Sequence, residues 1–441
     1  MSRLSRVAVG TIQPEANAQA MLWALMDLLQ SRGIEVQSFL SQALFPRHPG
    51  AAAITGLGAR HLDSWLMSPE TCRDIFVRGA GFADLALVEG RFDPPGGPEV
   101  LGGKLEPLCE WLDLPRVAIV DVSDIRPCRL PLCPQPLDGL LLDRVSNRTE
   151  LARLATDLES LWRAPVLGAL GDVPALRGEL AAIPRGDAPP RELCHQLGEQ
   201  LARWWNPDYL LELAYRREMP PCRPKRPCSG PAETELTVAI AYDEAFNCYF
   251  PDTLDMLEAR GASVVDFSPL RDEHLPPQAD VAYFGCGHPE RHAATLSENH
   301  CMAAALRSHV RAGRRVYGEG GGAAYLCQQM ETPDGQFKRM VGVLPAVARL
   351  NAAPRAADPL ELTLSRPNWL GNTGARVRGY QNPSWRLEAA GALMSFAAEP
   401  AYQDCLVGSY QAVGSMLHLD FAVQPAILDH FFCPETPNLQ E

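Results

Sequence analysis

The chain has 441 residues, of which 46% are hydrophobic and 21% are charged, and its formal net charge is −13. This composition is typical of a folded, water-soluble protein, and the length is sufficient for two domains. The negative charge argues against a nucleic-acid or anionic-membrane binder, and the absence of a run of 18 apolar residues argues against a transmembrane helix. Because the first residues also lack the apolar core of a secretory signal, we expect a cytoplasmic protein.

The thirteen cysteines are an odd number scattered along the chain, and we expect most of them to be reduced thiols in the protein core. Two pairs lie closer together, Cys128 with Cys133 and Cys222 with Cys228. Neither pair has the C-x-x-C spacing that is typical of metal sites. We therefore expect no metal, although a site built from these four thiolates stays open.

The first half of the chain alternates between predicted strands and helices. Residues 7–10 are predicted to form a buried strand, residues 20–32 a helix with apolar side chains at helical spacing, and residues 34–39 a second strand. This order predicts a parallel sheet with right-handed crossovers. Further core strands are predicted at residues 117–121, 139–145 and 164–170, and a helix begins within residues 206–214.

A proline-rich, basic stretch at residues 220–234 is predicted to be a linker between two domains, residues 1–219 and 235–441. The second domain opens with a predicted strand at residues 236–241. A helix that ends at Arg260 and a strand at residues 263–267 follow.

The most informative stretch is residues 316–326, VYGEGGGAAYL. A β-prone run leads into five residues rich in glycine, and a helix-prone run at residues 323–327 follows. A strand, a tight turn and a helix together form the elbow on which many enzymes present a nucleophile. Gly320 stands where the nucleophile would be.

This stretch resembles the elbow Tyr-Ala-Glu-Cys-Gly-Gly-Leu-Met-Tyr-Leu of the cobyrinate a,c-diamide synthases, with Gly320 in place of the cysteine. These are glutamine-dependent, ATP-using amidotransferases that amidate carboxylates of tetrapyrrole rings. Residues 61–67 and 243–254 also resemble motifs of the family, so that the resemblance covers nearly the whole chain. It implies an α/β protein, with a P-loop-type (dethiobiotin-synthetase-like), doubly wound parallel sheet domain followed by a class I glutamine-amidotransferase-like α/β domain.

The nucleotide-binding loop of the family, Gly-Thr-Ser-Ser-Gly-Val-Gly-Lys-Thr-Thr, corresponds to residues 10–19 here. Such a loop binds phosphate through backbone N–H groups and a lysine, and binds Mg²⁺ through a hydroxyl. Pro14 lacks an N–H, Glu15 adds a negative charge, and Asn17 replaces the lysine. We therefore do not expect ATP or Mg²⁺ to bind, and regard Glu89, which matches a metal-holding acid of the family, as a remnant. The positions of the degenerate loop are Gly10, Thr11, Ala16, Asn17 and Ala18.

The resemblance also assigns positions in the second domain. His418 aligns with the base that activates the cysteine, and residues 379–385 replace a substrate segment that contains two histidines and a glutamate in the family. The loop whose amides would stabilise an oxyanion is Gly285, Cys286 and Gly287. The residues that we expect to line a ligand cleft are Asp243, Phe246, Tyr249 and Tyr380.

Two other thiols lie near the position of the missing nucleophile. Loss of such a nucleophile costs on the order of a millionfold in rate. Cys327 lies about two helical turns beyond the elbow, and Cys286 lies in the oxyanion loop and is better placed. Without a thiol at position 320, a hydrogen-bonded structural role for His418 is the simpler interpretation.

Three functional hypotheses follow. The first is a pseudoenzyme that binds a tetrapyrrole, or that acts as a subunit or regulator of a protein partner or as a homodimer. The second is a working ATP- or ammonia-dependent tetrapyrrole (corrinoid- or sirohydrochlorin-type) a,c-diamide synthase. The third is an assembly protein without a small ligand.

Overall fold

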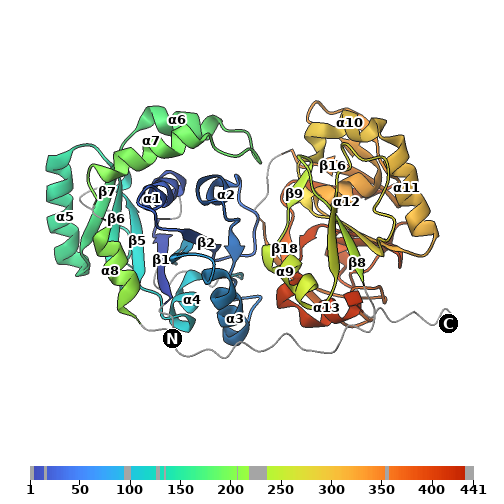
Figure 1. Cartoon of the computed structure of the whole chain (residues 1–441), viewed down its shortest axis with the longest axis horizontal. Helices are drawn as coiled ribbons and strands as arrows, with labels where there is room; N and C mark the ends of the chain where they lie inside the picture. Colours follow the sequence, from blue (N-terminus) through green and yellow to red (C-terminus); the bar gives the residue numbers. More distant parts are fainter. Residues whose placement is uncertain are drawn as a thin grey trace. The chain divides into compact units, whose positions relative to one another are not determined.

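A computed structural model describes residues 4–13, 17–93, 101–125, 130–133, 136–205, 207–217, 236–352 and 357–432. The chain divides into two compact units, Met1–Lys225 and Arg226–Glu441, and each is described by itself. They are blue to green and yellow to red in Figure 1. The predicted linker at residues 220–234 lies outside the described residues. No helix within the described ranges is long and apolar enough to cross a membrane.

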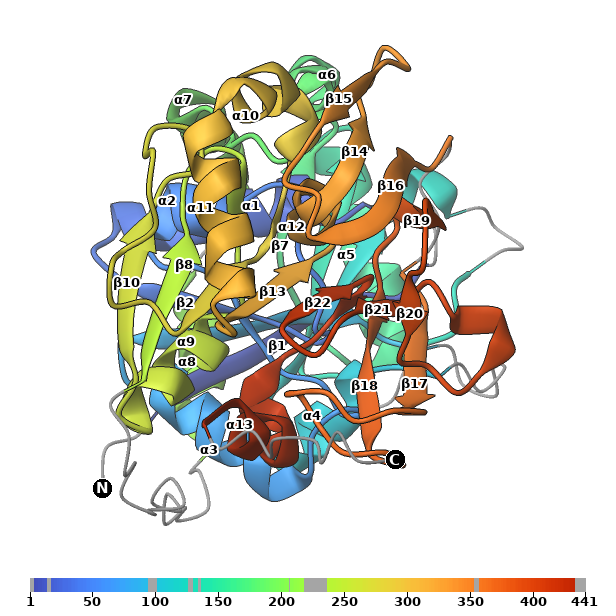
Figure 2. The ribbon, with the colours of Figure 1, turned by 90° about the vertical axis from the view of Figure 1, so that its right-hand side faces the viewer.

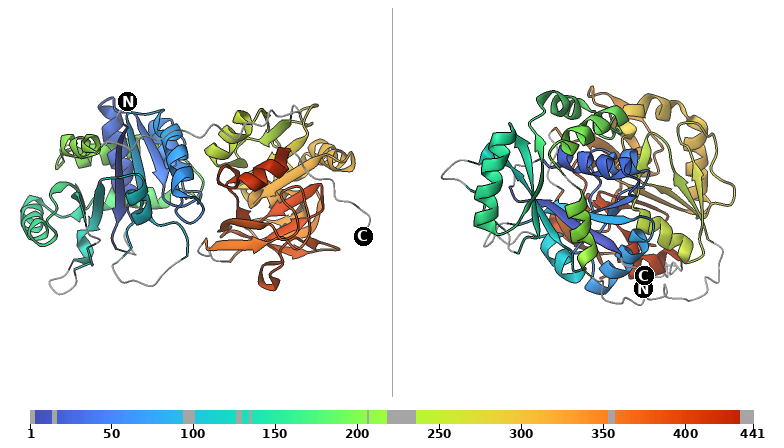
Figure 3. Two further views of the ribbon diagram at one scale, coloured as in Figure 1. Left: turned by 90° about the horizontal axis from the view of Figure 1, so that it is seen from below. Right: turned by 60° about the vertical axis from the view of Figure 1, so that its left-hand side comes forward.

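The first unit is built on a seven-stranded sheet with the strand order β3-β2-β4-β1-β5-β6-β7, in which every pair of neighbours is parallel. Its strands are β1 (Ser5–Thr11), β2 (Val36–Leu40), β3 (Arg60–His61), β4 (Leu85–Arg91), β5 (Arg116–Asp121), β6 (Gly139–Val145) and β7 (Val166–Gly171). Its helices are α1 (Gln19–Ser31), α2 (Gly50–Thr55), α3 (Pro69–Ala80), α4 (Leu105–Trp111), α5 (Arg148–Trp162), α6 (Pro174–Ala182), α7 (Arg191–Ala202) and α8 (Asp208–Arg216), with a 3₁₀ turn η1 (Val122–Asp124). Figure 3 shows helices on both sides of this sheet, as the doubly wound prediction requires.

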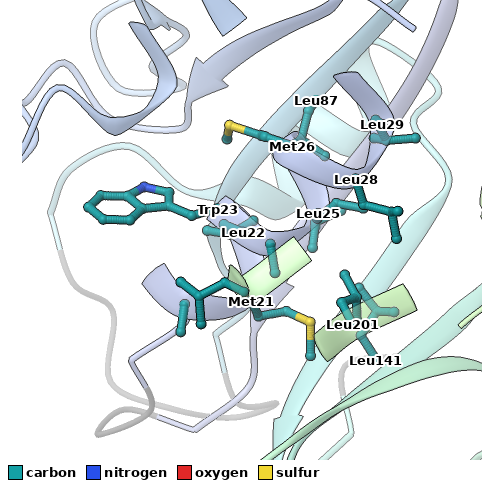
Figure 4. Packing of buried hydrophobic residues seen from close by; sticks show 14 of the residues in the cluster. Met21, Leu22, Trp23, Leu25, Met26, Leu28, Leu29, Leu87, Leu141 and Leu201 are labelled. Carbon is teal, nitrogen blue, oxygen red and sulfur yellow. The ribbon is translucent and has the colours of Figure 1, made fainter. Parts of the chain in front are cut away.

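Helix α1 lies between the sheet and α7, and nine of its thirteen residues are buried. Figure 4 shows its side chains in one cluster with Leu87 and Leu141 of the sheet and Leu201 of α7. A helix that is apolar on all sides has to be covered on all sides, which explains this position. The packing fixes the start of α1, and therefore the end of the loop that joins it to β1.

The second unit also has a seven-stranded sheet, with the order β10-β8-β11-β13-β22-β21-β20. The first five of these strands are parallel, and β21 and β20 are antiparallel additions. The strands are β8 (Thr237–Ala241), β10 (Ser263–Phe267), β11 (Val281–Phe284), β13 (Arg315–Glu319), β20 (Met394–Ser395), β21 (Leu406–Gly408) and β22 (Ala412–Ser415).

Helices cover both faces of this second sheet. One face packs against α11 and α12 and the other against α9 and α13, and Figure 2 shows α11 over β13. The helices are α9 (Pro251–Ala259), α10 (Ala293–Glu298), α11 (His300–Arg311), α12 (Gly321–Leu326) and α13 (Pro425–Phe432), with 3₁₀ turns η2 (Pro289–His292), η3 (Pro400–Tyr402) and η4 (Phe421–Val423). Smaller sheets contain β9 (Phe246–Cys248), β12 (Cys286–Gly287), β14 (Cys327–Glu331), β15 (Phe337–Arg339), β16 (Leu344–Leu350), β17 (Pro359–Thr363), β18 (Arg376–Gln381), β19 (Trp385–Ala389) and β23 (Leu417–His418).

The predicted helix through residue 327 was wrong at its end. Helix α12 ends at Leu326, and Cys327 is the first residue of β14, where it pairs with Leu344 of β16. The thiol therefore does not continue the elbow helix. It is fully buried, and its Sγ lies 3.2 Å from the carbonyl oxygen of Ala323.

Candidate functional site

The elbow of the second unit joins the central strand β13 to helix α12 through Gly320. This residue has φ +52° and ψ −110°, a left-handed conformation that favours glycine. Its N–H donates to the carbonyl of Ser415 at 2.8 Å, and its own carbonyl accepts from the N–H of Ala324 at 3.0 Å. The strained strand-to-helix turn that the sequence predicts is therefore present, although its residue carries no side chain.

Two other side chains fill the space in front of Gly320. A Cβ atom built on this glycine would lie 2.5 Å from Nδ2 of Asn382 and 2.8 Å from Sγ of Cys286. Both distances are shorter than van der Waals contact, so that no larger residue fits at position 320 without a shift of these neighbours.

Asn382 is held in place by its own turn. Its Oδ1 accepts hydrogen bonds from the backbone N–H groups of Ser384 at 2.8 Å and Trp385 at 3.0 Å. Because these bonds identify the oxygen, the NH₂ group is the end that faces Sγ of Cys286 and Nε2 of His418, each at 3.4 Å. The amide nitrogen thus lies between a thiol and an imidazole.

His418 is buried in β23 and paired with a buried acid. Its Nδ1 lies 3.0 Å from Oε1 of Glu319, and the exposed fractions of the two residues are 4% and 1%. Since the amide of Asn382 donates toward Nε2, Nε2 accepts and Nδ1 carries the proton that is donated to the carboxylate. A histidine oriented by a carboxylate is the base half of a catalytic triad.

Glu319 itself has further partners. Its Oε2 accepts from the backbone N–H of Leu419 and from the hydroxyl of Tyr317, both at 3.2 Å. The sequence placed Glu319 next to the elbow but did not reveal its pairing with His418. A carboxylate directly before the elbow residue was the available signal. For Asn382 the sequence offered none, because its contacts join segments that are far apart in the chain.

Cys286 lies in the predicted oxyanion loop and is half-buried. Burial raises the pKa of its thiol to about 12, and the nearby Glu319 adds to this increase. The backbone amides of Gly321 and Gly287 lower the pKa and so oppose this increase. The thiol is therefore protonated at neutral pH.

The four residues predicted to line a ligand cleft lie in the interior of the second unit, and their part in binding a ligand stays a prediction. Their exposed fractions are 8% for Asp243, 0% for Phe246, 9% for Tyr249 and 1% for Tyr380. Two of them stabilise loops. Asp243 accepts from the N–H of Ala245 at 2.9 Å, and the hydroxyl of Tyr249 accepts from the N–H of Gly285 at 2.9 Å. The amide of Gly285 is therefore also engaged within the protein.

In the first unit, the loop after β1 is tied to the neighbouring strand β5. The side chain of Gln13 donates to the carbonyl of Asp121 at 2.7 Å and accepts from the N–H of the same residue at 2.8 Å. Oδ1 of Asn17 accepts from the N–H of Gln19 at 3.0 Å, so that it caps the start of α1. Residues 14–16, which include Ala16, lie outside the described residues.

The glycine and small residues of this loop have packing roles. A Cβ atom on Gly10 would lie 2.8 Å from Cδ2 of Leu105, so the residue allows α4 to approach β1 closely. Thr11 is buried in the last position of β1. Ala18 is the residue before α1 and makes no side-chain cap. Ala18 therefore offers no hydroxyl in the place of the metal-binding residue of a phosphate-binding loop.

Ion pairs join the ends of β5, β6 and β7. Nε of Arg144 lies 3.0 Å from Oδ2 of Asp121, and its NH1 lies 3.6 Å from Asp172. Arg177 pairs with the buried Asp143, where burial raises the pKa of the carboxyl to about 6. Arg144 adopts φ +64°, a strained conformation for a residue other than glycine. The polar groups at this edge of the sheet therefore bind one another.

Glu89 ends the buried part of β4 and accepts a hydrogen bond from the hydroxyl of Ser38. Burial raises the pKa of its carboxyl to about 7. Two pockets of about 340 and 250 Å³ adjoin at this edge, and they share Ser41, Gln42 and Gly90 as lining residues. Glu89 lines the smaller pocket, while Lys104 lines the larger. The carboxyl edge of the sheet is therefore hollowed beside β4, whereas at β5, β6 and β7 its polar groups pair with one another.

Within the described ranges, no group of three or more histidine, cysteine or acidic residues could hold a metal ion. Cys128, Cys222 and Cys228 lie outside those ranges, and Cys133 is half-buried. The prediction about these four thiols therefore stays a prediction.

The sequence is similar to a known protein family and to characterised relatives. Residues 237–424 match the CobB/CobQ-like glutamine amidotransferase domain, a range that contains the whole elbow site. The cobyrinate a,c-diamide synthase of Salmonella typhimurium is 28% identical over 433 residues, which cover 92% of this chain and 93% of that protein. The chain is a homologue of the cobyrinate a,c-diamide synthases.

A second cobyrinate a,c-diamide synthase, from Dehalococcoides mccartyi, is 28% identical over 460 residues and covers 97% of each chain. A crystal structure of a glutamine amidotransferase is 17% identical, with a TM-score of 0.35, and covers 44% of this chain and 96% of that one. The homology to the cobyrinate a,c-diamide synthases thus extends over both units, and not only over the elbow.

Proposed function

We propose that this chain is a cobyrinate a,c-diamide synthase-like protein that does not hydrolyse glutamine and that binds a tetrapyrrole as a non-enzymatic subunit or regulator of a partner protein. The observation that carries the proposal is at the elbow. Gly320 provides no atom for attack, and Asn382 and Cys286 fill the space in which a nucleophilic side chain would lie. The base and the nucleophile of such a site act as a unit, so the histidine alone supplies no comparable rate.

The first unit supports the same proposal. Asn17 has no positive charge to offer a triphosphate, and its side chain already caps α1. Gln13 joins the loop to Asp121 of β5 through two hydrogen bonds. Phosphate-binding loops act through backbone N–H groups and a lysine, and the position of that lysine is Asn17 here.

A tetrapyrrole is proposed as the ligand because the homology covers both units of enzymes whose name refers to cobyrinate. Visible absorption titration of the purified protein with a corrinoid, sirohydrochlorin and haem tests this part. We expect a saturable spectral shift near one equivalent for at least one ring. No shift for any of the three would reject tetrapyrrole binding and would leave the subunit or assembly role, for which a protein partner has to be found.

A second candidate function is amidation of a tetrapyrrole with free ammonia. It is favoured by the retention of Glu89 at the hollowed carboxyl edge of the first sheet, where its carboxyl has a pKa raised to about 7. Incubation of a tetrapyrrole carboxylate with ATP, Mg²⁺ and ammonium, followed by mass spectrometry, separates the two candidates. Conversion of a carboxyl group to an amide would establish the second, and an unchanged ring beside an active control enzyme would reject it.

A further inference from the structure

We propose that Asn382 and Cys286 form a plug that closes an otherwise assembled catalytic dyad of His418 and Glu319. Under this proposal the elbow site is blocked rather than dismantled. If the side chains of Asn382 and Cys286 were removed and a cysteine placed at position 320, His418 would activate the new thiol as a nucleophile. The inference rests on the proposed function, since it concerns the same inactive elbow, but it makes a separate claim about the residues that remain there.

The backbone of the elbow has the form of a strand-to-helix nucleophile turn. β13 ends at Glu319, Gly320 adopts φ +52°, and α12 begins at the next residue. The hydrogen bonds of Gly320 to Ser415 and Ala324 hold the turn on both sides. A chain that had lost the elbow altogether would not need a left-handed residue at this point.

His418, the base of the site, is held in one orientation by Glu319. Glu319 receives hydrogen bonds from Nδ1 of His418, the N–H of Leu419 and the hydroxyl of Tyr317. These bonds fix the carboxylate, and the carboxylate fixes the imidazole with Nε2 as the acceptor. Nε2 faces the amide nitrogen of Asn382, and that nitrogen lies only 2.5 Å from a Cβ atom at position 320. The amide therefore takes the place between base and elbow in which a thiol would lie.

Cys286 also fills the space beside the elbow. Its Sγ would lie 2.8 Å from a Cβ atom at position 320, and the residue belongs to the loop that the sequence assigns to an oxyanion hole. Removal of this side chain would leave that space free for a substrate.

The plug does not open by rotation of one side chain. Oδ1 of Asn382 accepts hydrogen bonds from the backbone N–H groups of Ser384 and Trp385. The backbone N–H of Asn382 donates to the carbonyl of Met416 at 2.7 Å. A thiol added at position 320 would therefore collide with Asn382 and Cys286 while both remain. We expect Gly320→Cys alone to give no reactive thiol.

The test uses the full chain with the substitutions Gly320→Cys, Cys286→Gly and Asn382→Ala combined, and the same triple variant with His418→Ala. The rate at which iodoacetamide alkylates position 320 is measured from pH 5 to pH 10 by peptide mass spectrometry, which resolves this thiol from the others. An ordinary thiol has a pKa of about 8.5. In the triple variant we expect the curve of alkylation rate against pH to have its inflection at least about one pH unit below that value. This shift corresponds to about tenfold faster alkylation at neutral pH. Addition of His418→Ala should abolish this difference.

A buried histidine elsewhere in the same unit provides the matched control. His309 is also buried, and its Nε2 contacts the carbonyl of Arg315 at 3.0 Å. His309→Ala in the triple variant should leave the inflection in place. An inflection near that of an ordinary thiol, whether or not His418 is present, would overturn the proposal.

A second measurement does not depend on the folding of the triple variant. In Asn382→Ala alone, Cys286 loses the side-chain amide that contacts it. Because access to a thiol controls how fast it is alkylated, alkylation of Cys286 should be at least about tenfold faster than in the unmodified protein. An unchanged rate would refute the plug. Glutamate formation by the unmodified protein would instead refute the proposed function, so that the two claims fail separately.

Discussion

The substitution Gly320→Ala gives the most direct test of how the elbow is filled. The left-handed conformation costs a residue with a Cβ about 1–3 kcal/mol. The added methyl group would lie 2.5 Å from Nδ2 of Asn382 and 2.8 Å from Sγ of Cys286, and an overpacked site of this kind costs about 1–3 kcal/mol more. We therefore expect the second unit to lose about 2–6 kcal/mol of unfolding free energy, since the two costs add.

Gly313 is the matched control, because it also has a positive φ, +80°, but a Cβ atom there would meet nothing within 4 Å. Gly313→Ala should cost only the backbone strain, about 1–2 kcal/mol. Both variants are measured by urea unfolding followed by near-ultraviolet circular dichroism. Asn382→Ala should recover part of the loss in Gly320→Ala, with a coupling free energy of about 0.5–3 kcal/mol. Equal costs at the two glycines, or no coupling, would show that the elbow is not filled as described.

Two further predictions concern buried polar groups. Gln13→Ala should lower the unfolding free energy of the first unit by about 2–4 kcal/mol, because it leaves the backbone N–H and carbonyl of Asp121 without their partner. The control Gln328→Ala, at an exposed position, should cost less than about 0.5 kcal/mol in the same urea unfolding assay. Equal losses would contradict the role of Gln13. Burial and the nearby Asp252 raise the pKa of the Asp420 carboxyl to about 7. The folded protein therefore binds the proton of this carboxyl more tightly than the unfolded chain does. As a result, the unfolding free energy falls as the pH rises from about 4 to about 7. Asp420→Asn should remove about 1–4 kcal/mol of this decline in unfolding free energy between pH 4 and pH 7, and an unchanged pH dependence would exclude Asp420 as its source.

Much of the architecture could be predicted from the sequence, because it depends on local patterns. The strands at residues 139–145 and 263–267 were predicted with the bounds that the structure has. The end of the elbow helix was wrong by one residue, since an apolar cysteine fits a buried helix and a buried strand equally well. Helix α1 was predicted from its apolar spacing, although its nearly complete burial depends on α7, which is distant in the sequence.

The candidate site was less accessible from the sequence. The elbow glycine and His418 could be identified from single motifs. The contact of Asn382 with Cys286 could not, because the two residues are 96 positions apart and neither belongs to a pattern that requires the other. The burial of the four residues expected in a ligand cleft could not be predicted for a related reason. Polar and aromatic side chains such as Asp243 and Tyr249 also stabilise buried turns, and only tertiary structure distinguishes the two uses.

The most direct test of the central claim is glutamate formation from glutamine by the purified full-length protein, with and without ATP, Mg²⁺ and a tetrapyrrole. An active glutamine amidotransferase serves as the positive control, and Cys286→Ala and His418→Ala are measured in parallel. The account predicts no glutamate above the buffer rate under any of these conditions. Glutamate release that increases in proportion to the protein, and that is lost in either variant, would contradict it and would identify Cys286 and His418 as a working pair.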